Sequence, residues 1–151
     1  MERYYSLLRE ATACGLTVIE KKFKSTAKGI IKGNKIGMRY DLPVIEKVSV
    51  LAEEIGHYHT AVGDFTDQTK LENRKKERLG RAWAYQYLIP LDRIIEAGQA
   101  GVEGRFAVAE YLEVTEEFLQ ETIEYYQRKH ELYTHHKEHI INWEPLFIVK
   151  L

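Results

Sequence analysis

The sequence predicts an α+β protein that is mainly α-helical, with a small antiparallel sheet or hairpin and a C-terminal helical unit similar to a helix-turn-helix. Three observations lead to this prediction. Pro43 suits the first turn of a helix, and apolar residues recur at helical spacing from there to His59. Two short apolar runs flank Gly33-Asn34, which is typical of a β-hairpin. Residues 105–112 and 115–129 are two helical patterns with a short break between them.

Length and composition bound the class of protein. A chain of 151 residues can form one domain with a sizeable core, or a core with a small helical appendage. Its formal net charge of −1 and pI near 6.6 argue against general attraction to nucleic acids or membranes. The single cysteine, Cys14, excludes an internal disulfide framework and a four-cysteine zinc cluster. We see no signal peptide and no apolar run of transmembrane length, so we expect a cytosolic protein.

The first half of the chain alternates between helix and strand patterns. In the hairpin, Ile36, Met38 and Tyr40 alternate onto one face of the expected sheet. The edge of this sheet could bind an extended peptide by strand addition, although most such edges have no function. The expected elements are a helix over 2–13 that ends at Gly15, a strand over 16–23, and hairpin strands over 29–32 and 35–40.

The second half is mostly helical until its last twenty residues. The first part of its long helix is basic, which indicates a solvated surface, and Thr115 is a suitable N-cap for the last helix. Near the end, a tract with His135, His136 and His139 is more typical of an exposed loop than of a metal site. The closing strand is expected to dock on the sheet. The expected elements are a loop over 60–67, helices over 68–88, 90–99, 105–112 and 115–129, an exposed loop over 133–139 and a closing strand over 143–150.

The segment Val50-Leu51-Ala52-Glu53-Glu54-Ile55-Gly56-His57 carries the chemistry. Glu53 and His57 are four residues apart, so on a helix they share a face, with Glu54 at its edge. The zinc-protease pattern His-Glu-x-x-His uses this geometry: two ligands hold the metal and the Glu between them activates a water. Here Glu53 stands in place of the first His. An acidic pair followed by His is more often a solvated face, but the apolar stripe lies opposite, and Gly56 allows another helix to approach closely.

A third ligand would have to come from a second helix. Glu77 is a candidate, because Gly80, Arg81 and Ala84 share its face and two of these are small enough for close packing on the motif helix. His59 points elsewhere if the motif helix is continuous. Cys14 near the end of the first helix is more typical of a small buried residue than of a nucleophile.

The helix pair over 105–129 raises the alternative of a DNA-binding regulator. Between Glu103 and Glu131 there are eight Glu against three basic residues, a net charge of −5. Affinity for a duplex depends on Lys and Arg, so we interpret the pair as a packing or protein-recognition unit.

The chain resembles the ImmA/IrrE-type metallo-endopeptidases of phages and integrative elements, and the resemblance covers nearly all of it. The segment from Val50 to Thr60 is similar to the family's Leu-Ala-His-Glu-Leu-Gly-His motif. The stretch from Glu77 through Ala84 to Leu88-Ile89-Pro90 is similar to its second motif, a Glu-bearing helix that ends in a Leu-Met-Pro-like turn. The resemblance implies a zincin-like fold, which we divide into a metallopeptidase core (1–90), a helical substrate-recognition unit (91–131) and a C-terminal tail (132–151).

Carried over residue by residue, the resemblance implies that Glu54 is the general base and that His57 and Glu77 are metal ligands. Glu53 occupies the position of the first His ligand, and a carboxylate is an acceptable ligand for zinc. The expected metal is Zn²⁺, and the extra carboxylate makes a harder divalent ion such as Mn²⁺ an alternative. Gly80-Arg81 also differs from the family, which more often has Ala and then a small polar or acidic residue.

The family's role implies the substrate. We expect an endopeptidase that cleaves or inactivates a helix-turn-helix repressor of a mobile element, through a metal-activated water with Glu54 as the base. The alternative is a non-catalytic anti-repressor that binds the repressor with a degenerate zincin fold. Neither hypothesis requires nucleic acid or a membrane.

Overall fold

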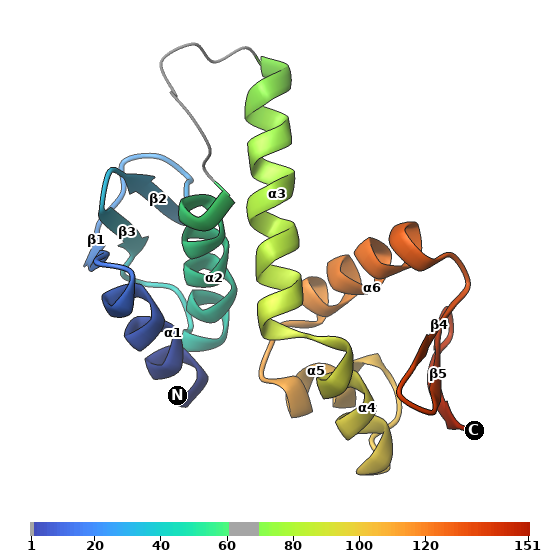
Figure 1. The fold of residues 1–151 in the computed structure, drawn as a ribbon. Coiled ribbons are helices and arrows are strands. Elements are labelled where there is room, and N and C mark those ends of the chain that lie inside the picture. Colours follow the sequence, from blue (N-terminus) through green and yellow to red (C-terminus); the bar gives the residue numbers. More distant parts are fainter. Residues whose placement is uncertain (1, 61–69) are drawn as a thin grey trace. The chain divides into compact units, whose positions relative to one another are not determined.

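The computed structural model describes residues 2–60 and 70–151, and the side chains of 2–60 and 73–151. These residues form six helices and two three-stranded sheets, in two compact units, Met1–Ala84 and Tyr85–Leu151 (Figure 1). Of the loop predicted over residues 60–67, Thr60 instead ends a helix, and residues 61–67 lie outside the described part. The predicted division at residues 90 and 131 into core, recognition unit and tail stays a prediction.

The first unit holds a mixed sheet rather than the antiparallel one predicted. Its strands are β1 (Thr17–Lys21), β2 (Gly29–Lys32) and β3 (Lys35–Arg39), in the order β1-β3-β2. The hairpin is confirmed, since β2 and β3 pair antiparallel around Gly33, whose φ of +59° suits glycine. β1 instead pairs parallel with β3, a pairing between segments that no local turn signal encodes.

Two helices pack with this sheet to form the first core. They are α1 (Glu2–Ala13) and α2 (Val44–Thr60), both close to their predicted bounds. Ile36 and Met38 of β3 are fully buried, as the alternation predicted, whereas Tyr40 lies beyond the strand and is 50% exposed. The residues buried from the helices are Leu7, Ala11, Val48, Leu51, Ala52, Ile55 and Gly56.

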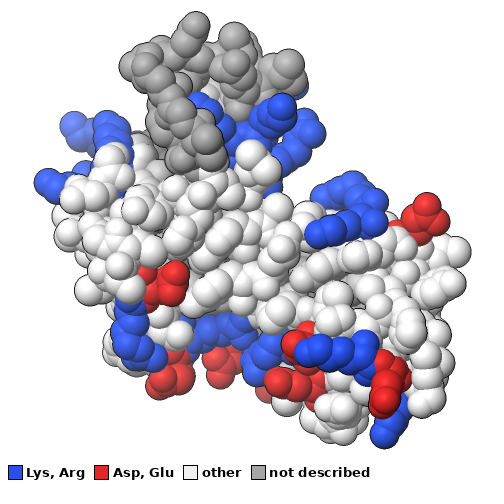
Figure 2. Space-filling view, viewed as in Figure 1, with Lys and Arg blue, Asp and Glu red and all other residues white. Residues whose placement is uncertain are grey.

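The long helix α3 (Lys70–Leu88) begins near the predicted residue 68. Figure 2 shows Lys and Arg side chains gathered over its first half. Arg74, Lys75, Arg78 and Arg81 are exposed there, so the predicted solvated basic surface is confirmed for the described side chains.

The second unit begins with three helices close to their predicted bounds, which are α4 (Leu91–Gln99), α5 (Arg105–Leu112) and α6 (Glu116–His130). Thr115 is the predicted N-cap of α6, and its Oγ1 accepts a hydrogen bond of 3.0 Å from the Phe118 amide. Tyr126 of α6 donates to the Ile89 carbonyl at 2.8 Å and stacks on Trp143, which ties this helix into the core.

The C-terminal segment corrects two predictions. The predicted exposed loop is β4 (Tyr133–His136) followed by β5 (His139–Trp143), and His139 is buried. The closing strand is β6 (Leu146–Lys150), which pairs with β5 in a second antiparallel sheet instead of docking on the first. The physical reason is the burial of His139, Ile141 and Trp143 at alternating positions of β5, a period-two signal that the histidine-rich composition concealed.

No helix in the described part of the chain combines the length and apolar character that crossing a membrane requires.

Candidate metal and catalytic site

Helix α2 separates an apolar side from a polar one. Leu51, Ala52, Ile55 and Gly56 are buried, whereas Glu53, Glu54 and His57 are half-buried. The helix continues to Thr60, whose hydroxyl donates to the Gly56 carbonyl at 2.7 Å. The predicted apolar stripe is therefore confirmed at Val48, Leu51 and Ile55, but Val44 at the helix start is 39% exposed.

Two glycines bring α3 against α2. A Cβ placed on Gly56 would lie 2.3 Å from the Gly80 carbonyl oxygen, which is far inside contact distance. Both residues are buried. The predicted close approach of the two helices is confirmed, and it depends on the absence of a side chain at Gly56.

The same contact positions the imidazole of His57. A Cβ on Gly80 would lie 2.4 Å from His57 Nδ1, so this ring lies directly against the Gly80 backbone. On the other ring nitrogen, His57 Nε2 lies 3.5 Å from Glu77 Oε1. The structure therefore brings together two of the three predicted metal ligands, one from each helix.

Glu54 has the electrostatic environment of a proton acceptor. Burial, followed by the neighbouring negative charges of Glu77 and Glu53, raises the pKa of its carboxyl from 4.5 to about 7. Strand β2 approaches this side chain, because a Cβ on Gly29 would lie 3.3 Å from Glu54 Oε1. A carboxylate whose pKa lies near neutral pH suits general base catalysis.

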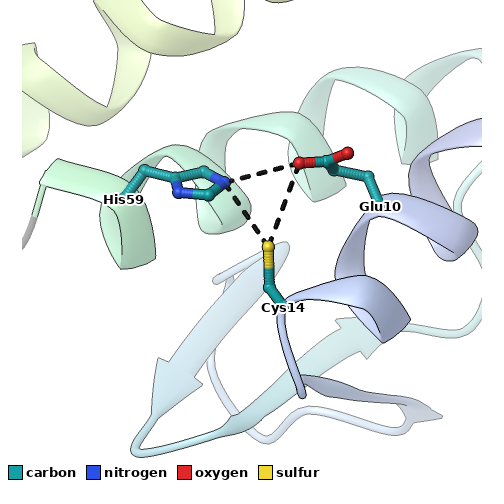
Figure 3. Close-up of side chains that lie close together, drawn as sticks. All are labelled: Glu10, Cys14 and His59. Carbon is teal, nitrogen blue, oxygen red and sulfur yellow. Dashed lines mark hydrogen bonds and ion pairs between the residues drawn. The ribbon is translucent and has the colours of Figure 1, made fainter.

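Glu53 lies close enough to contribute charge to the Glu54 site. Its role as a metal ligand stays a prediction, as does the assignment of His57 and Glu77 to a metal. Among the described residues, Glu10, Cys14 and His59 each offer one potential ligand atom, and these three atoms all lie within 4.8 Å of one another (Figure 3). Of the three residues, only His59 belongs to α2.

Sequence reasoning missed three of the residues that shape these sites. Gly29 was assigned only to a strand end, yet it leaves the space that Glu54 occupies. Glu10 and Cys14 are four residues apart at the end of the predicted first helix, which is a detectable spacing. Their partner His59 lies 45 residues after Cys14, and only the fold brings these segments together. As predicted for a continuous α2, His59 points elsewhere, and its Nε2 faces Glu10 and Cys14.

The half-buried Glu54 carboxyl thus lies near the pair of His57 and Glu77, which two different helices contribute. The family model for the IrrE N-terminal-like domain, Peptidase_M78, matches residues 11–124, well over half of the chain. The chain belongs to this family of metallopeptidases. Comparison with curated proteins and with solved structures found no significant match.

Family membership implies zinc, and the residues present fit a divalent cation. The Glu54 carboxyl feels the charges of Glu77 and Glu53, and Glu77 also lies 3.5 Å from the imidazole of His57. Burial and then the repulsion from these two carboxylates raise the pKa of Glu54, and a cation would relieve the repulsion. Carboxylate oxygens and an imidazole nitrogen are also ordinary zinc ligands.

Proposed function

We propose that this chain is a metal-dependent endopeptidase that cleaves or inactivates a helix-turn-helix repressor of a phage or integrative element. One observation carries the proteolytic part. The half-buried Glu54, with its pKa raised to about 7, lies next to the pair of His57 and Glu77. The repressor as substrate rests on the family resemblance alone.

In this proposal Glu53, His57 and Glu77 hold the metal. A bound divalent cation supplies positive charge that acidifies a water molecule and polarises a peptide carbonyl. His57 presents Nε2 toward Glu77, and its Nδ1 side is fixed against Gly80. This arrangement favours a single orientation of the imidazole, which a metal ligand requires.

Glu54 performs the proton transfers. Its carboxylate accepts a proton from the attacking water and then donates that proton to the leaving amine. Both steps need a carboxyl whose pKa lies near the working pH, and burial together with two neighbouring carboxylates provides that value.

The sheet edge supports an extended peptide as the substrate. β2 is a terminal strand of its sheet, and Gly29 at its start faces the Glu54 side chain. A peptide added to this edge as another strand would pass beside the proposed base.

The second candidate function is a non-catalytic anti-repressor. Glu53 favours it, because a second carboxylate in place of the first His makes a bound metal less electrophilic. Such a protein would bind the repressor and leave it intact.

Incubation with the helix-turn-helix repressor encoded beside this chain distinguishes the two functions, with mass spectrometry as the readout. We expect new repressor termini with the native chain, their loss on chelation, and a decrease of at least about 100-fold in cleavage rate with Glu54→Gln. Glu46→Gln, on the first turn of the same helix, is the matched control and should cleave normally. Release of an intact repressor from its operator, unchanged by chelator or by Glu54→Gln, would contradict the peptidase and favour the anti-repressor.

A further inference from the structure

A second cluster of metal-binding side chains lies where α1 ends beside the last turn of α2 (Figure 3). Glu10 lies in the last turn of α1, Cys14 directly follows that helix, and His59 comes from α2. Figure 3 shows the three side chains pointing toward one another from these two segments. The distances are 3.6 Å from Cys14 Sγ to His59 Nε2, 3.6 Å from His59 Nε2 to Glu10 Oε1, and 3.9 Å from Cys14 Sγ to Glu10 Oε1.

The geometry differs from that of a nucleophilic triad. In a triad, the nucleophile and the carboxylate bond to opposite nitrogens of the imidazole. Here the thiol and the carboxylate both face the same nitrogen, Nε2 of His59. Burial and the Glu10 carboxylate also raise the pKa of the Cys14 thiol, which disfavours the thiolate that nucleophilic attack requires.

The separations match those between ligands of one ion. Direct hydrogen bonds between nitrogen and oxygen span about 2.7–3.2 Å, and the 3.6 Å between His59 and Glu10 is longer. For a tetrahedral zinc ion, bond lengths of about 2.0–2.3 Å place neighbouring ligand atoms roughly 3.4–3.6 Å apart. All three observed separations lie within a few tenths of an ångström of that range.

We propose that Glu10, Cys14 and His59 form a second metal site, which binds Zn²⁺ through one carboxylate oxygen, one thiolate sulfur and one imidazole nitrogen. Sulfur and nitrogen ligands favour zinc over magnesium or calcium. Water completes the fourth position, since the Glu10 and His59 side chains are each about one-third exposed (34% and 31%). The proposal does not depend on the peptidase site, because the two sets share no residue.

The imidazole of His59 is held in place before any metal binds. Its ring stacks on Trp83 of α3, with centroids 4.9 Å apart and planes 28° from parallel. Nε2 is thereby directed toward α1 without further rotation of the side chain. Metal at this point would connect the end of α1 to the last turn of α2, two residues beyond His57.

Cobalt titration of the reduced, chelator-stripped full chain tests the site, because a thiolate bound to Co²⁺ gives an intense ultraviolet charge-transfer band. We expect the band in the native chain, saturating by two equivalents of Co²⁺ per chain because the peptidase site also binds the metal, and we expect added Zn²⁺ to remove it. Cys14→Ser should abolish it, while His59→Ala and Glu10→Gln should each weaken cobalt binding about 10-fold or more. His57→Ala should retain the band, which separates this site from the peptidase site.

A variant whose single cysteine stands at another position of the same segment provides the matched control. Thr12 is exposed on α1, and the double variant Cys14→Ser/Thr12→Cys keeps one cysteine while removing it from Glu10 and His59. Native circular dichroism with no charge-transfer band is the expected result for this variant. No band in the native chain, or a band unaffected by His59→Ala and Glu10→Gln, would overturn the proposal.

Discussion

Glu54 shows how a single residue acquires its chemistry from its surroundings. An exposed glutamate is ionised at neutral pH, but burial and the charges of Glu53 and Glu77 raise the pKa of this one to about 7. The folded chain therefore binds a proton at Glu54 over a pH range in which the unfolded chain does not. Stability should depend on pH for this reason, independently of catalysis.

We predict that, without metal, the Glu54→Gln variant becomes increasingly more stable than the unsubstituted chain as pH rises from 4.5 to above 7. The Glu54 carboxyl stabilises the folded chain fully at pH values below the pKa that it has in the unfolded chain. This stabilisation is lost as pH rises through the pKa that it has in the folded chain. The change in the free-energy difference should be on the order of 3 kcal/mol. Urea unfolding of both chains in chelator, at several pH values, measures it.

Glu46→Gln serves as the control for replacing a glutamate on the same helix. Parallel stability curves for the native chain and Glu54→Gln between pH 4.5 and 8 would show that the carboxyl of Glu54 is not perturbed by folding. Added Zn²⁺ should reduce the difference between the two chains, because a nearby cation favours the ionised carboxyl.

At the scale of elements, the site depends on how closely α3 approaches α2. The carbonyl of Gly80 occupies the space where a side chain on Gly56 would begin. This neighbour is backbone within a helix, so it cannot rotate away as a side chain can. Contact of this kind makes the small size of Gly56 a structural requirement.

We predict that Gly56→Ala lowers the free energy of unfolding by about 2–3 kcal/mol, although alanine is the better helix former. The added methyl would force the two helices apart, which should also separate His57 from Glu77. Thermal or urea unfolding measures the loss. Glu46→Ala on the same helix should change stability by less than about 1 kcal/mol, and an equal effect of the two variants would contradict the explanation.

Sequence periodicity predicted the helices and the β2–β3 hairpin well, because both depend on local signals. The apolar spacing of α2, Thr115 before α6 and the Gly33 turn each acts within a few residues. The parallel pairing of β1 with β3 and the second sheet were missed, since non-local strand pairing leaves little trace in a short segment.

The candidate sites also divide into residues that local sequence signals identify and residues that only the fold brings together. Glu54 and His57 share one helix, so their spacing and the family resemblance were sufficient to identify them. Glu77 was proposed from small residues on its face, and its approach to His57 is observed. The cluster of Glu10, Cys14 and His59 could not be predicted, because it exists only where two segments distant in sequence meet.

At the scale of the whole molecule, charge decides which partners the helix pair α5–α6 can bind. The stretch from Glu103 to Glu131 carries eight Glu and three basic residues. One of those three, Arg105, bonds to Gln120 and lies 3.8 Å from Glu116, while Lys129 lies over the Tyr125 ring. Little positive charge is therefore left to contact phosphates.

We predict that the full chain gives no saturable binding to a fluorescent duplex of about 30 base pairs at protein concentrations up to about 10 μM in 0.1 M salt. Non-specific affinity for DNA arises from Lys and Arg that displace counterions, and this stretch offers a net charge of −5. Fluorescence anisotropy measures the binding. Saturable binding that weakens steeply between 50 and 200 mM salt would contradict this expectation and restore the helix pair as a DNA-binding unit.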